Sequence, residues 1–331
     1  MLRARDPNAA RPVPFPKTAV FEPPTDGPAP LGGLPPPDPA PGPSLDIDFP
    51  GPGNVSTARR RARSPYGPII DAHSHPLLPG EPPIISASQT AEEYLRRAKG
   101  LDLRFTAAFV IAPRQELEHT RALNDKVLEL GRRTDGRFFP VCSVHPHDRT
   151  KALAEVDRVA TAGARALKLH PNTQGFDVAD GTVRSVVERA TRHRLPVVFD
   201  GYSPFDANQP GKFVQLAMAV PEARIVVAHA HGPQFPALVV YEVLARYPWW
   251  RRNVWIDLSA TASLFAGSPF AEQLTWVLRK VGIDRLLFAS DYPLDDPVRA
   301  AEAVVSLGFT RTERTAIFYD NAAQLFGLPP R

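Results

Sequence analysis

Histidine and aspartate residues recur in this chain directly after short apolar runs, where they could bind a metal ion. The first run leads into Asp71-Ala72-His73-Ser74-His75, and the last run leads into Asp291. Between them, one run ends at Asp200 and another leads into His229. Neutral imidazoles and carboxylates are ligands for zinc, manganese and iron in proteins. The residue types therefore predict a site for a divalent metal ion.

His73 and His75 form the most specific part of this pattern. Alternate residues of a strand share one face, so both imidazoles are expected to point the same way. A His-x-His pair alone is a weak signal, because it occurs more often on the surface of a strand. The presence of Asp291 after the last apolar run strengthens it, because a carboxylate joins the two imidazoles.

Short apolar runs alternate with longer amphipathic segments from Gly67 onward. We predict strands at residues 69–73, 105–111, 138–144, 164–169, 196–199, 224–228, 254–258 and 285–289. We predict helices at residues 91–99, 115–133, 151–161, 183–192, 212–219, 235–246, 270–281, 297–307 and 311–326. Continuous apolar strands such as Ile225-Val226-Val227-Ala228 are typical of a parallel sheet buried on both faces. Eight alternations favour an α/β fold with a closed (β/α)8 TIM barrel, and a doubly wound open sheet is the alternative.

The positions of the histidines agree with a barrel. All strands of a parallel barrel end on one face, where barrel enzymes keep their active sites. Of the nine histidines, His119 falls within a predicted helical segment and His193 directly follows one. The other seven lie at predicted strand ends, so we expect them to gather near one face.

Four segments carry a resemblance to a known family. Asp71-Ala72-His73-Ser74-His75, Ala228-His229-Ala230-His231-Gly232 and Phe288-Ala289-Ser290-Asp291-Tyr292-Pro293 resemble the strand 1, strand 6 and strand 8 motifs of the amidohydrolase superfamily. The ending Asn321-Ala322-Ala323-Gln324-Leu325-Phe326-Gly327-Leu328 is similar to the C-terminal helix of its amidohydrolase-related branch. That branch includes aminocarboxymuconate semialdehyde decarboxylase and resorcylate decarboxylases beside many metal-dependent hydrolases. The resemblance covers about residues 68–328 and is specific for fold and metal site, but not for substrate.

The resemblance implies one divalent metal ion, with zinc as the leading candidate, held by His73, His75, Asp291 and Asp200. It also implies that Asp291 accepts a proton from an activated water, and that His229 orients this water or stabilises a developing oxyanion. One departure concerns Asp200, because the family usually has a metal-binding histidine at this point. Asp200 is then either a carboxylate ligand or an unmetallated pocket residue, in which case His229 would take its place.

Four more residues are candidates for contact with a substrate, namely Lys168, His170, His145 and Tyr202. The context of Lys168 resembles that of a carboxylated lysine that bridges two metals in some members of the superfamily. Alternatively, Lys168 or His170 pairs with a substrate carboxylate, or Lys168 forms a structural salt bridge with Asp200. His145 and Tyr202 follow predicted strands, and ordinary loop packing is the alternative for both.

Residues 1–66 differ in composition from everything that follows. Proline recurs, as in Pro35-Pro36-Pro37, and few aliphatic residues are present to form a core. This composition favours polyproline-like or disordered chain. We therefore predict a Pro/Gly-rich N-terminal extension at 1–66, either disordered or wrapped around the domain or a neighbouring subunit, and a barrel at 67–331.

Composition and charge exclude several classes of function. The net charge of +4 is matched by four arginines between residues 59 and 63, and no basic face with interleaved aromatics is evident, so we expect no nucleic-acid partner. No apolar run approaches the roughly 20 residues of a membrane span, and the N-terminus lacks the apolar stretch of a secretory signal. The single cysteine, Cys142, excludes an intramolecular disulfide and fits a reducing cytoplasm. We expect a cytoplasmic protein with a small-molecule substrate, and a homodimer is an open alternative.

Three functions compete on this basis. The first is a metal-dependent hydrolase that cleaves a C–N or C–O bond in an amide, lactam or lactone, including a substrate that bears a carboxylate. The second is a metal-dependent non-oxidative decarboxylase on the same barrel. The third is a catalytically silent barrel that acts as a binding protein.

Overall fold

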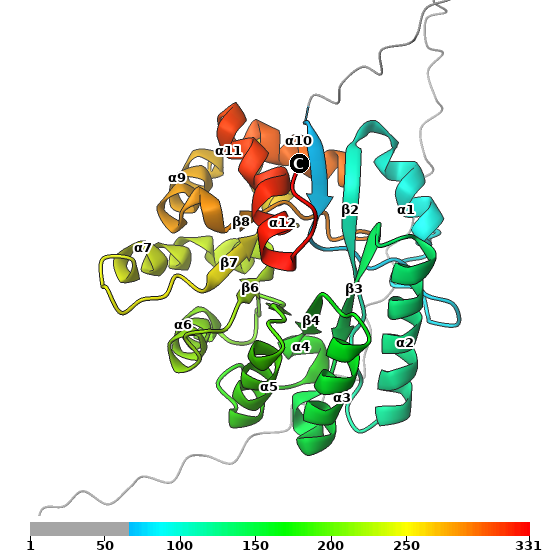
Figure 1. The fold of residues 1–331 in the computed structure, drawn as a ribbon. Coiled ribbons are helices and arrows are strands. Elements are labelled where there is room, and N and C mark those ends of the chain that lie inside the picture. Colours follow the sequence, from blue (N-terminus) through cyan, green and yellow to red (C-terminus); the bar gives the residue numbers. More distant parts are fainter. Residues whose placement is uncertain (1–65) are drawn as a thin grey trace, which may run out of the picture. The chain divides into compact units, whose positions relative to one another are not determined.

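All eight predicted strands are present in the computed structural model, which describes residues 66–331 (Figure 1). Each strand pairs in parallel with the next one along the chain. The strands are β1 (Pro68–Asp71), β2 (Asp102–Phe109), β3 (Phe138–Ser143), β4 (Ala166–Leu169), β5 (Val197–Phe199), β6 (Ile225–Val227), β7 (Val254–Asp257) and β8 (Leu286–Leu287). The predicted (β/α)8 barrel is therefore confirmed. The predicted extension lies, apart from residue 66, outside the described residues and stays a prediction.

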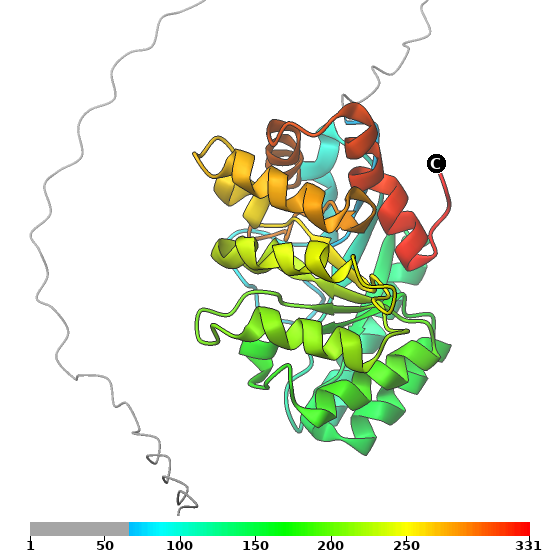
Figure 2. The ribbon, with the colours of Figure 1, turned by 90° about the vertical axis from the view of Figure 1, so that its left-hand side faces the viewer.

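Helices connect the strands and lie outside the barrel; Figure 2 shows α6, the segment at 228–244 and α9 side by side. The α-helices are α1 (Ala91–Arg97), α2 (Leu117–Arg133), α3 (Thr150–Thr161), α4 (Pro171–Gln174), α5 (Gly181–Arg192), α6 (Gln209–Ala219), α7 (Val240–Leu244), α8 (Thr261–Phe265), α9 (Ala271–Val281), α10 (Pro297–Ser306), α11 (Arg311–Thr315) and α12 (Asn321–Phe326). Shorter 3-10 segments are η1 (Ala98–Gly100), η2 (Pro146–Asp148), η3 (Ala228–Val239) and η4 (Ile283–Arg285), and η5 (Ala316–Asp320) is a π-helix. No helix in the described part of the chain is long and apolar enough to cross a membrane.

Two predicted helices differ from the structure. The helix expected at 235–246 is the 3-10 segment η3 followed by α7, and η3 contains Pro233 and Pro236, which have no N–H to donate. The terminal helix expected at 311–326 is divided into α11, η5 and α12. The helices α4 and α8 were not predicted, because four and five residues are too few to show a helical period.

Strand β4 shows how one strand serves two layers of the fold. Ala166 belongs to the apolar cluster inside the barrel, whereas Leu167 and Leu169 pack between the strands and the helices. Because side chains alternate along a strand, Lys168 points into the barrel with Ala166. The alternation therefore carries a charged group into the interior, where Lys168 is 1% exposed.

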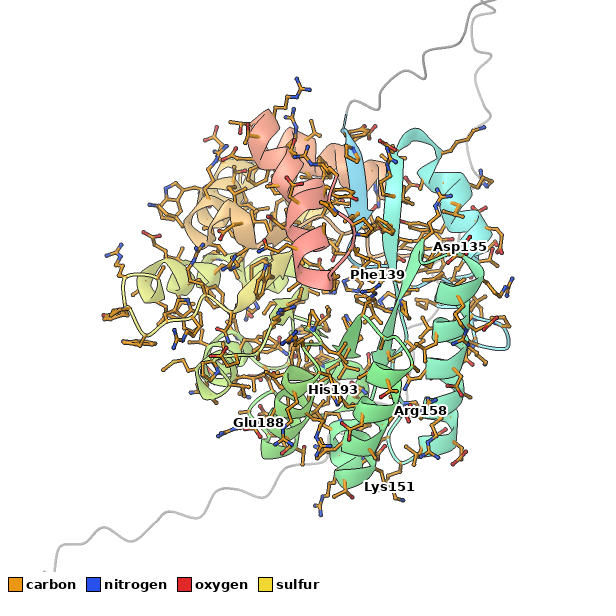
Figure 3. The ribbon with its side chains drawn as sticks, viewed as in Figure 1. Asp135, Phe139, Lys151, Arg158, Glu188 and His193 are labelled. Atoms are coloured by element: carbon orange, nitrogen blue, oxygen red, sulfur yellow. The ribbon has the colours of Figure 1, made fainter. Side chains whose placement is uncertain are left out.

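The C-terminal helix closes the end of the barrel at which the strands begin. Leu325 and Phe326 of α12 pack in the same apolar cluster as the inward-facing strand residues. The ring of Phe326 lies 5.1 Å from that of Phe139, near the start of β3 (Figure 3). The opposite end, where the strands finish, is thus the end at which a site can open.

Charged side chains cover the outer helices. On α3, Val156 and Val159 are buried, whereas Lys151 and Arg158 reach outward (Figure 3). The Arg158 guanidinium lies 2.7 Å from Asp125 on α2 and so ties two neighbouring helices together. The outer helices therefore follow the amphipathic pattern that predicted them.

The buried carboxylate of Asp71 joins β1 to the segment after β8, where the barrel closes. It accepts hydrogen bonds from the backbone N–H of His73 (3.1 Å) and of Ser290 (2.9 Å). It also accepts from the hydroxyls of Tyr94 (2.8 Å) and Ser290 (2.5 Å). Burial raises the pKa of Asp71 to about 6, although these hydrogen bonds favour the charged form. Close by, the Asp291 N–H donates to the His73 carbonyl (2.8 Å), so the two motif segments are fixed side by side.

The tight contact between the ends of β5 and β6 gives a test of the fold. A side chain at Gly201 would collide with the Ala228 carbonyl and with Val227, whereas Gly211 in α6 has open space. We expect Gly201→Ala to lower the free energy of unfolding by about 1–3 kcal/mol, because the backbone must shift. The matched change Gly211→Ala is expected to raise it by up to about 1 kcal/mol, because alanine favours a helix. Urea unfolding measures both, and equal stabilities would contradict the packing described here.

Candidate metal centre

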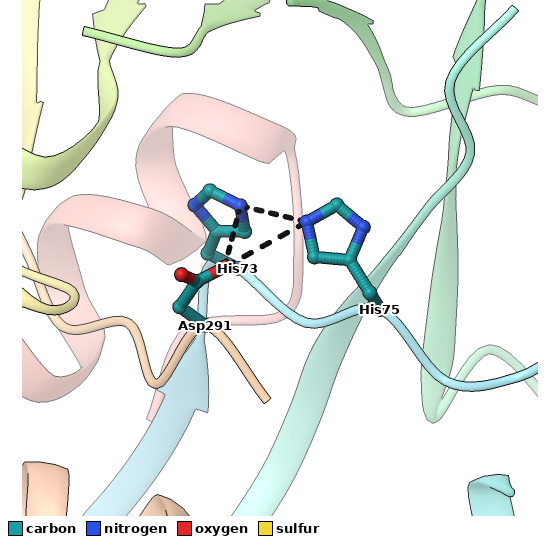
Figure 4. A group of neighbouring side chains, drawn as sticks. All are labelled: His73, His75 and Asp291. Carbon is teal, nitrogen blue, oxygen red and sulfur yellow. Dashed lines mark hydrogen bonds and ion pairs between the residues drawn. The ribbon is translucent and has the colours of Figure 1, made fainter. Parts of the chain in front are cut away.

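Three side chains converge where β1 and β8 end (Figure 4). Nε2 of His73 lies 3.1 Å from Nε2 of His75 and 3.3 Å from Oδ1 of Asp291. The third separation, between Nε2 of His75 and Oδ1 of Asp291, is 3.7 Å. The structure thus brings together three of the four predicted ligands, although positions 73 and 291 are 218 residues apart in the sequence.

This donor set fits a divalent metal ion. Ligand atoms at about 2.0–2.1 Å from a tetrahedral ion lie about 3.3 Å from one another, close to the three separations seen here. Burial lowers the pKa of His73, and it holds the pKa of His75 well below the usual range. Both imidazoles are therefore neutral near pH 7, which is the form that binds a metal.

Asp257 at the end of β7 was not among the predicted site residues, yet it contacts His73 directly. Its Oδ2 accepts a hydrogen bond of 2.7 Å from Nδ1 of His73, and both side chains are buried. Because Nδ1 donates, the unprotonated Nε2 faces His75 and Asp291, as in metal-binding histidines oriented by a carboxylate. Burial alone would raise the pKa of Asp257, but the interactions with His73, His229 and Ser259 together outweigh it and keep this pKa well below its usual value.

The sequence did carry a signal for Asp257. It ends the apolar strand Val254-Trp255-Ile256, as Asp200 ends its own strand. The rule that selected Asp200 would have selected Asp257 as well. The prediction treated Asp257 as part of a strand at 254–258, whereas β7 finishes at this residue.

His229 is linked to the same network. Oγ of Ser259 lies 3.0 Å from Nδ1 of His229 and also donates a short hydrogen bond to Asp257. A chain of polar contacts therefore runs from His73 through Asp257 and Ser259 to His229. The ligand atoms of His73, His229 and Asp257 form a second group within 4.8 Å of one another.

Two of the predicted catalytic residues have an uncommon backbone conformation. His229 has φ 59° and Asp291 has φ 58°, in the left-handed region that favours glycine. Such conformations cost about 1–3 kcal/mol and cluster at functional sites. For Asp291, the N–H bond to the His73 carbonyl helps to hold this conformation.

Asp200, the fourth predicted ligand, lies beside the three converging groups. Its Oδ2 is 3.1 Å from Nδ1 of His170, and its Oδ1 is 3.4 Å from Nε2 of His229. Neither group of metal-ligating atoms found among residues 66–331 includes it. Burial lowers the pKa of His170 to about 4, against the opposing charge of Asp200. In the structure, the Asp200 carboxylate pairs with the imidazoles of His170 and His229. Metal binding by Asp200 stays a prediction.

Lys168 places a buried amine beside the metal ligands. Its Nζ lies 3.4 Å from Nε2 of His73 and 5.1 Å from the centre of the Phe109 ring. Burial lowers its pKa, while Asp200 and other nearby carboxylates oppose this effect. Among the described residues, Lys168 forms no salt bridge with Asp200. The structural salt bridge that was the alternative role of Lys168 is therefore absent from this part of the chain.

His145 does not present a ring nitrogen to a substrate. Its Nε2 donates to the Gln174 carbonyl (2.7 Å), and its Nδ1 accepts from the N–H of His147 (3.2 Å). The side chain is fully buried. The expected contact of His145 with a substrate is therefore at odds with its position, and His145 anchors the loops after β3 and β4.

A cavity of about 1030 Å³ opens onto this centre. Asp200, Tyr202, His229 and Asp291 are among the residues that line it. Ligand sites in proteins have volumes of about 300–1,000 Å³, so the cavity has room for a small molecule. Of the four residues predicted to contact a substrate, Tyr202 faces this cavity.

Solved structures with this fold come from both reaction classes. The 5-carboxyvanillate decarboxylase LigW of Sphingomonas paucimobilis has a TM-score of 0.59 and 16% identity over 79% of this chain and 99% of its own. The 2,6-dihydroxybenzoate decarboxylase from Rhizobium has a TM-score of 0.60 and 15% identity over 78% of this chain and 98% of its own. A putative 2-pyrone-4,6-dicarboxylic acid hydrolase from Pseudomonas putida has a TM-score of 0.57 and 21% identity over 80% and 98%. At these identities the likeness shows the fold.

Sequence comparison identifies the family. An uncharacterized protein of Sinorhizobium fredii, y4mH, is 33% identical over 137 residues, a match that spans 36% of this chain and 43% of that protein. The family model described as amidohydrolase matches residues 70–328, from β1 to the end of the C-terminal helix. The chain belongs to the amidohydrolase family.

Proposed function

We propose that this protein is a metal-dependent hydrolase that uses an activated water to cleave a C–N or C–O bond of a small molecule. The observation that carries the proposal is the convergence of His73, His75 and Asp291, with separations of 3.1–3.7 Å between their ligand atoms. These three residues would hold one divalent ion, with zinc first because two imidazoles and a carboxylate suit it. The proposed compartment is the cytoplasm, which the single buried cysteine supports.

The residues around the three converging groups would have separate roles in hydrolysis. A bound divalent ion would lower the pKa of water from about 15.7 toward 7. The Asp291 carboxylate accepts one proton of the attacking water, whose oxygen forms a bond to the substrate carbonyl carbon. As the C–N or C–O bond breaks, the same proton passes from Asp291 to the leaving nitrogen or oxygen. His229, which also lines the cavity, donates to the oxyanion that develops on the carbonyl oxygen.

A second candidate function is non-oxidative decarboxylation. The observation that favours it is the buried Nζ of Lys168 at 3.4 Å from Nε2 of His73. An ammonium group at this point would bind a substrate carboxylate close to the metal ligands. In that reaction the C–C bond to the carboxylate breaks, carbon dioxide leaves, and the carbon takes up a proton.

Removal of the ligand side chains tests the metal site. We expect the full chain to bind one zinc ion. We expect His73→Ala and His75→Ala each to retain less than about one tenth of it after dialysis, because only two of the three ligands remain. The matched control is His119→Ala, an exposed histidine on α2. Metal analysis by mass spectrometry measures the content. If the unaltered chain bound no divalent metal even after reconstitution, a silent barrel would replace both enzyme proposals.

Replacement of Asp291 tests the proton transfer. We expect Asp291→Asn to lower turnover about 10³-fold or more, because an amide accepts no proton from water. Circular dichroism should show a folded barrel, since the backbone contacts of Asp291 remain. Asp320→Asn, at an exposed carboxylate paired with Arg331, is the control. Turnover within a few-fold of the unaltered enzyme in Asp291→Asn would end the proposed role.

The products separate the two reaction classes. The zinc-loaded chain is incubated in parallel with lactones and aryl amides and with hydroxybenzoates, and acid release and carbon dioxide release are recorded. The hydrolase proposal predicts acid release without carbon dioxide. Under this proposal, Lys168→Met should still release acid. Carbon dioxide release that Lys168→Met abolishes would move the assignment to a lyase.

A further inference from the structure

Two cavities meet at the three converging groups. The large cavity is the one of about 1030 Å³ lined by Asp291 and His229. The small cavity has a volume of about 480 Å³ and is lined by His75 and Phe109. The facing atoms of His75 and Asp291 are 3.7 Å apart, so lining residues of the two cavities come together at this point. A molecule held there has room to extend in both directions.

The short helix α4 separates the two cavities. Asn172 lines the large cavity, whereas the next two residues, Thr173 and Gln174, line the small one. The Gln174 side chain donates to the carbonyls of Ala112 (2.8 Å) and Val144 (3.0 Å), which fixes the helix to the ends of β2 and β3. The helix α4 is therefore held in a fixed position between the two cavities.

The large cavity is acidic. Its lining includes four carboxylates, those of Asp200, Asp291, Asp295 and Glu302. Arg299 is the one arginine or lysine among its lining residues, and it is paired with Asp295 at 2.5 Å. Asp200 is paired as well, with His170 and His229. The lining of the large cavity thus offers no unpaired cation to an anionic group, and it accepts a neutral or basic one.

The small cavity has the opposite character. Its wall is largely apolar, and Arg114 lies at its edge with no ion pair to any described residue. Its one carboxylate, Glu81, is already bound to Lys126 (2.5 Å) and His119 (3.3 Å). Arg114 is therefore available to an anionic group at the end of an apolar arm.

We propose that the substrate is two-armed, with the scissile bond between a carboxylate-bearing apolar arm in the small cavity and a larger neutral or basic arm in the large cavity. The inference rests on the proposed hydrolase, whose reaction needs a bond placed at the three converging groups. An amide or ester that joins an apolar dicarboxylic or amino-acid-like half to a bulky neutral or basic half has this form.

Hydroxamates, which chelate zinc, test the proposal by binding alone. The zinc-loaded full chain is titrated calorimetrically with acetohydroxamate, with one-armed benzohydroxamate and with two-armed N-phenylbenzohydroxamate. The second arm should tighten binding about 10-fold or more, because another ring is buried. One carboxylate on the two-armed probe should tighten it further, about 10-fold, and a carboxylate on each ring should weaken it again, because one must enter the acidic cavity.

Variants assign the effect to its residue. Arg114→Ala should remove the gain from the single carboxylate and leave the uncharged two-armed probe unchanged, while Arg114→Lys should keep part of the gain. Arg132→Ala, an exposed arginine elsewhere on α2, is the control. A two-armed probe that binds no tighter than benzohydroxamate, or a carboxylate gain that survives Arg114→Ala, overturns this inference while the metal site stands. Failure of acetohydroxamate to bind the zinc-treated chain would instead overturn the proposed function, and the inference with it.

Discussion

The buried carboxylate of Asp71 is the interaction on which the rest of the site depends. It binds backbone N–H groups on either side of the closing point of the barrel, one at His73 and one at Ser290. His73 is a predicted ligand and Ser290 precedes another, Asp291, so the same contacts that close the barrel also set the positions of these two residues. A carboxylate in such a buried place is costly unless its oxygens are satisfied, and four hydrogen bonds satisfy them here.

The barrel and the convergence of His73, His75 and Asp291 could be predicted from the sequence because both follow from short-range regularities. Strand alternation turns Lys168 into the barrel, and parallel strands bring their ends to one face. The partners of each side chain were harder to foresee, since they depend on distances across the barrel. His145 looked like a pocket residue until both of its ring nitrogens proved to bind backbone groups. Asp257 was missed although it ends a strand as Asp200 does, because no motif drew attention to it.

The shape of the site could not be predicted from the sequence for a related reason. The helix α4 has four residues, and nothing in Pro171-Asn172-Thr173-Gln174 shows a helical period. Its position comes from the Gln174 side chain, which binds carbonyls that follow two other strands. Likewise, the difference in charge between the two cavities depends on which charged groups are already paired, and composition carries no information on pairing.

The closing point of the barrel has a consequence for how the protein responds to its ion. Ser290 and Asp71, which join there, are 219 residues apart in sequence, so the contact closes most of the described part of the chain into a ring. An ion shared by His73, His75 and Asp291 would cross-link the two ends of that ring and oppose their separation on heating. The binding energy would then stabilise the folded chain by mass action, and the melting temperature would rise with the concentration of the free metal ion. Loss of the ion would thus destabilise the barrel at its closing point, which is also the point where the proposed reaction takes place.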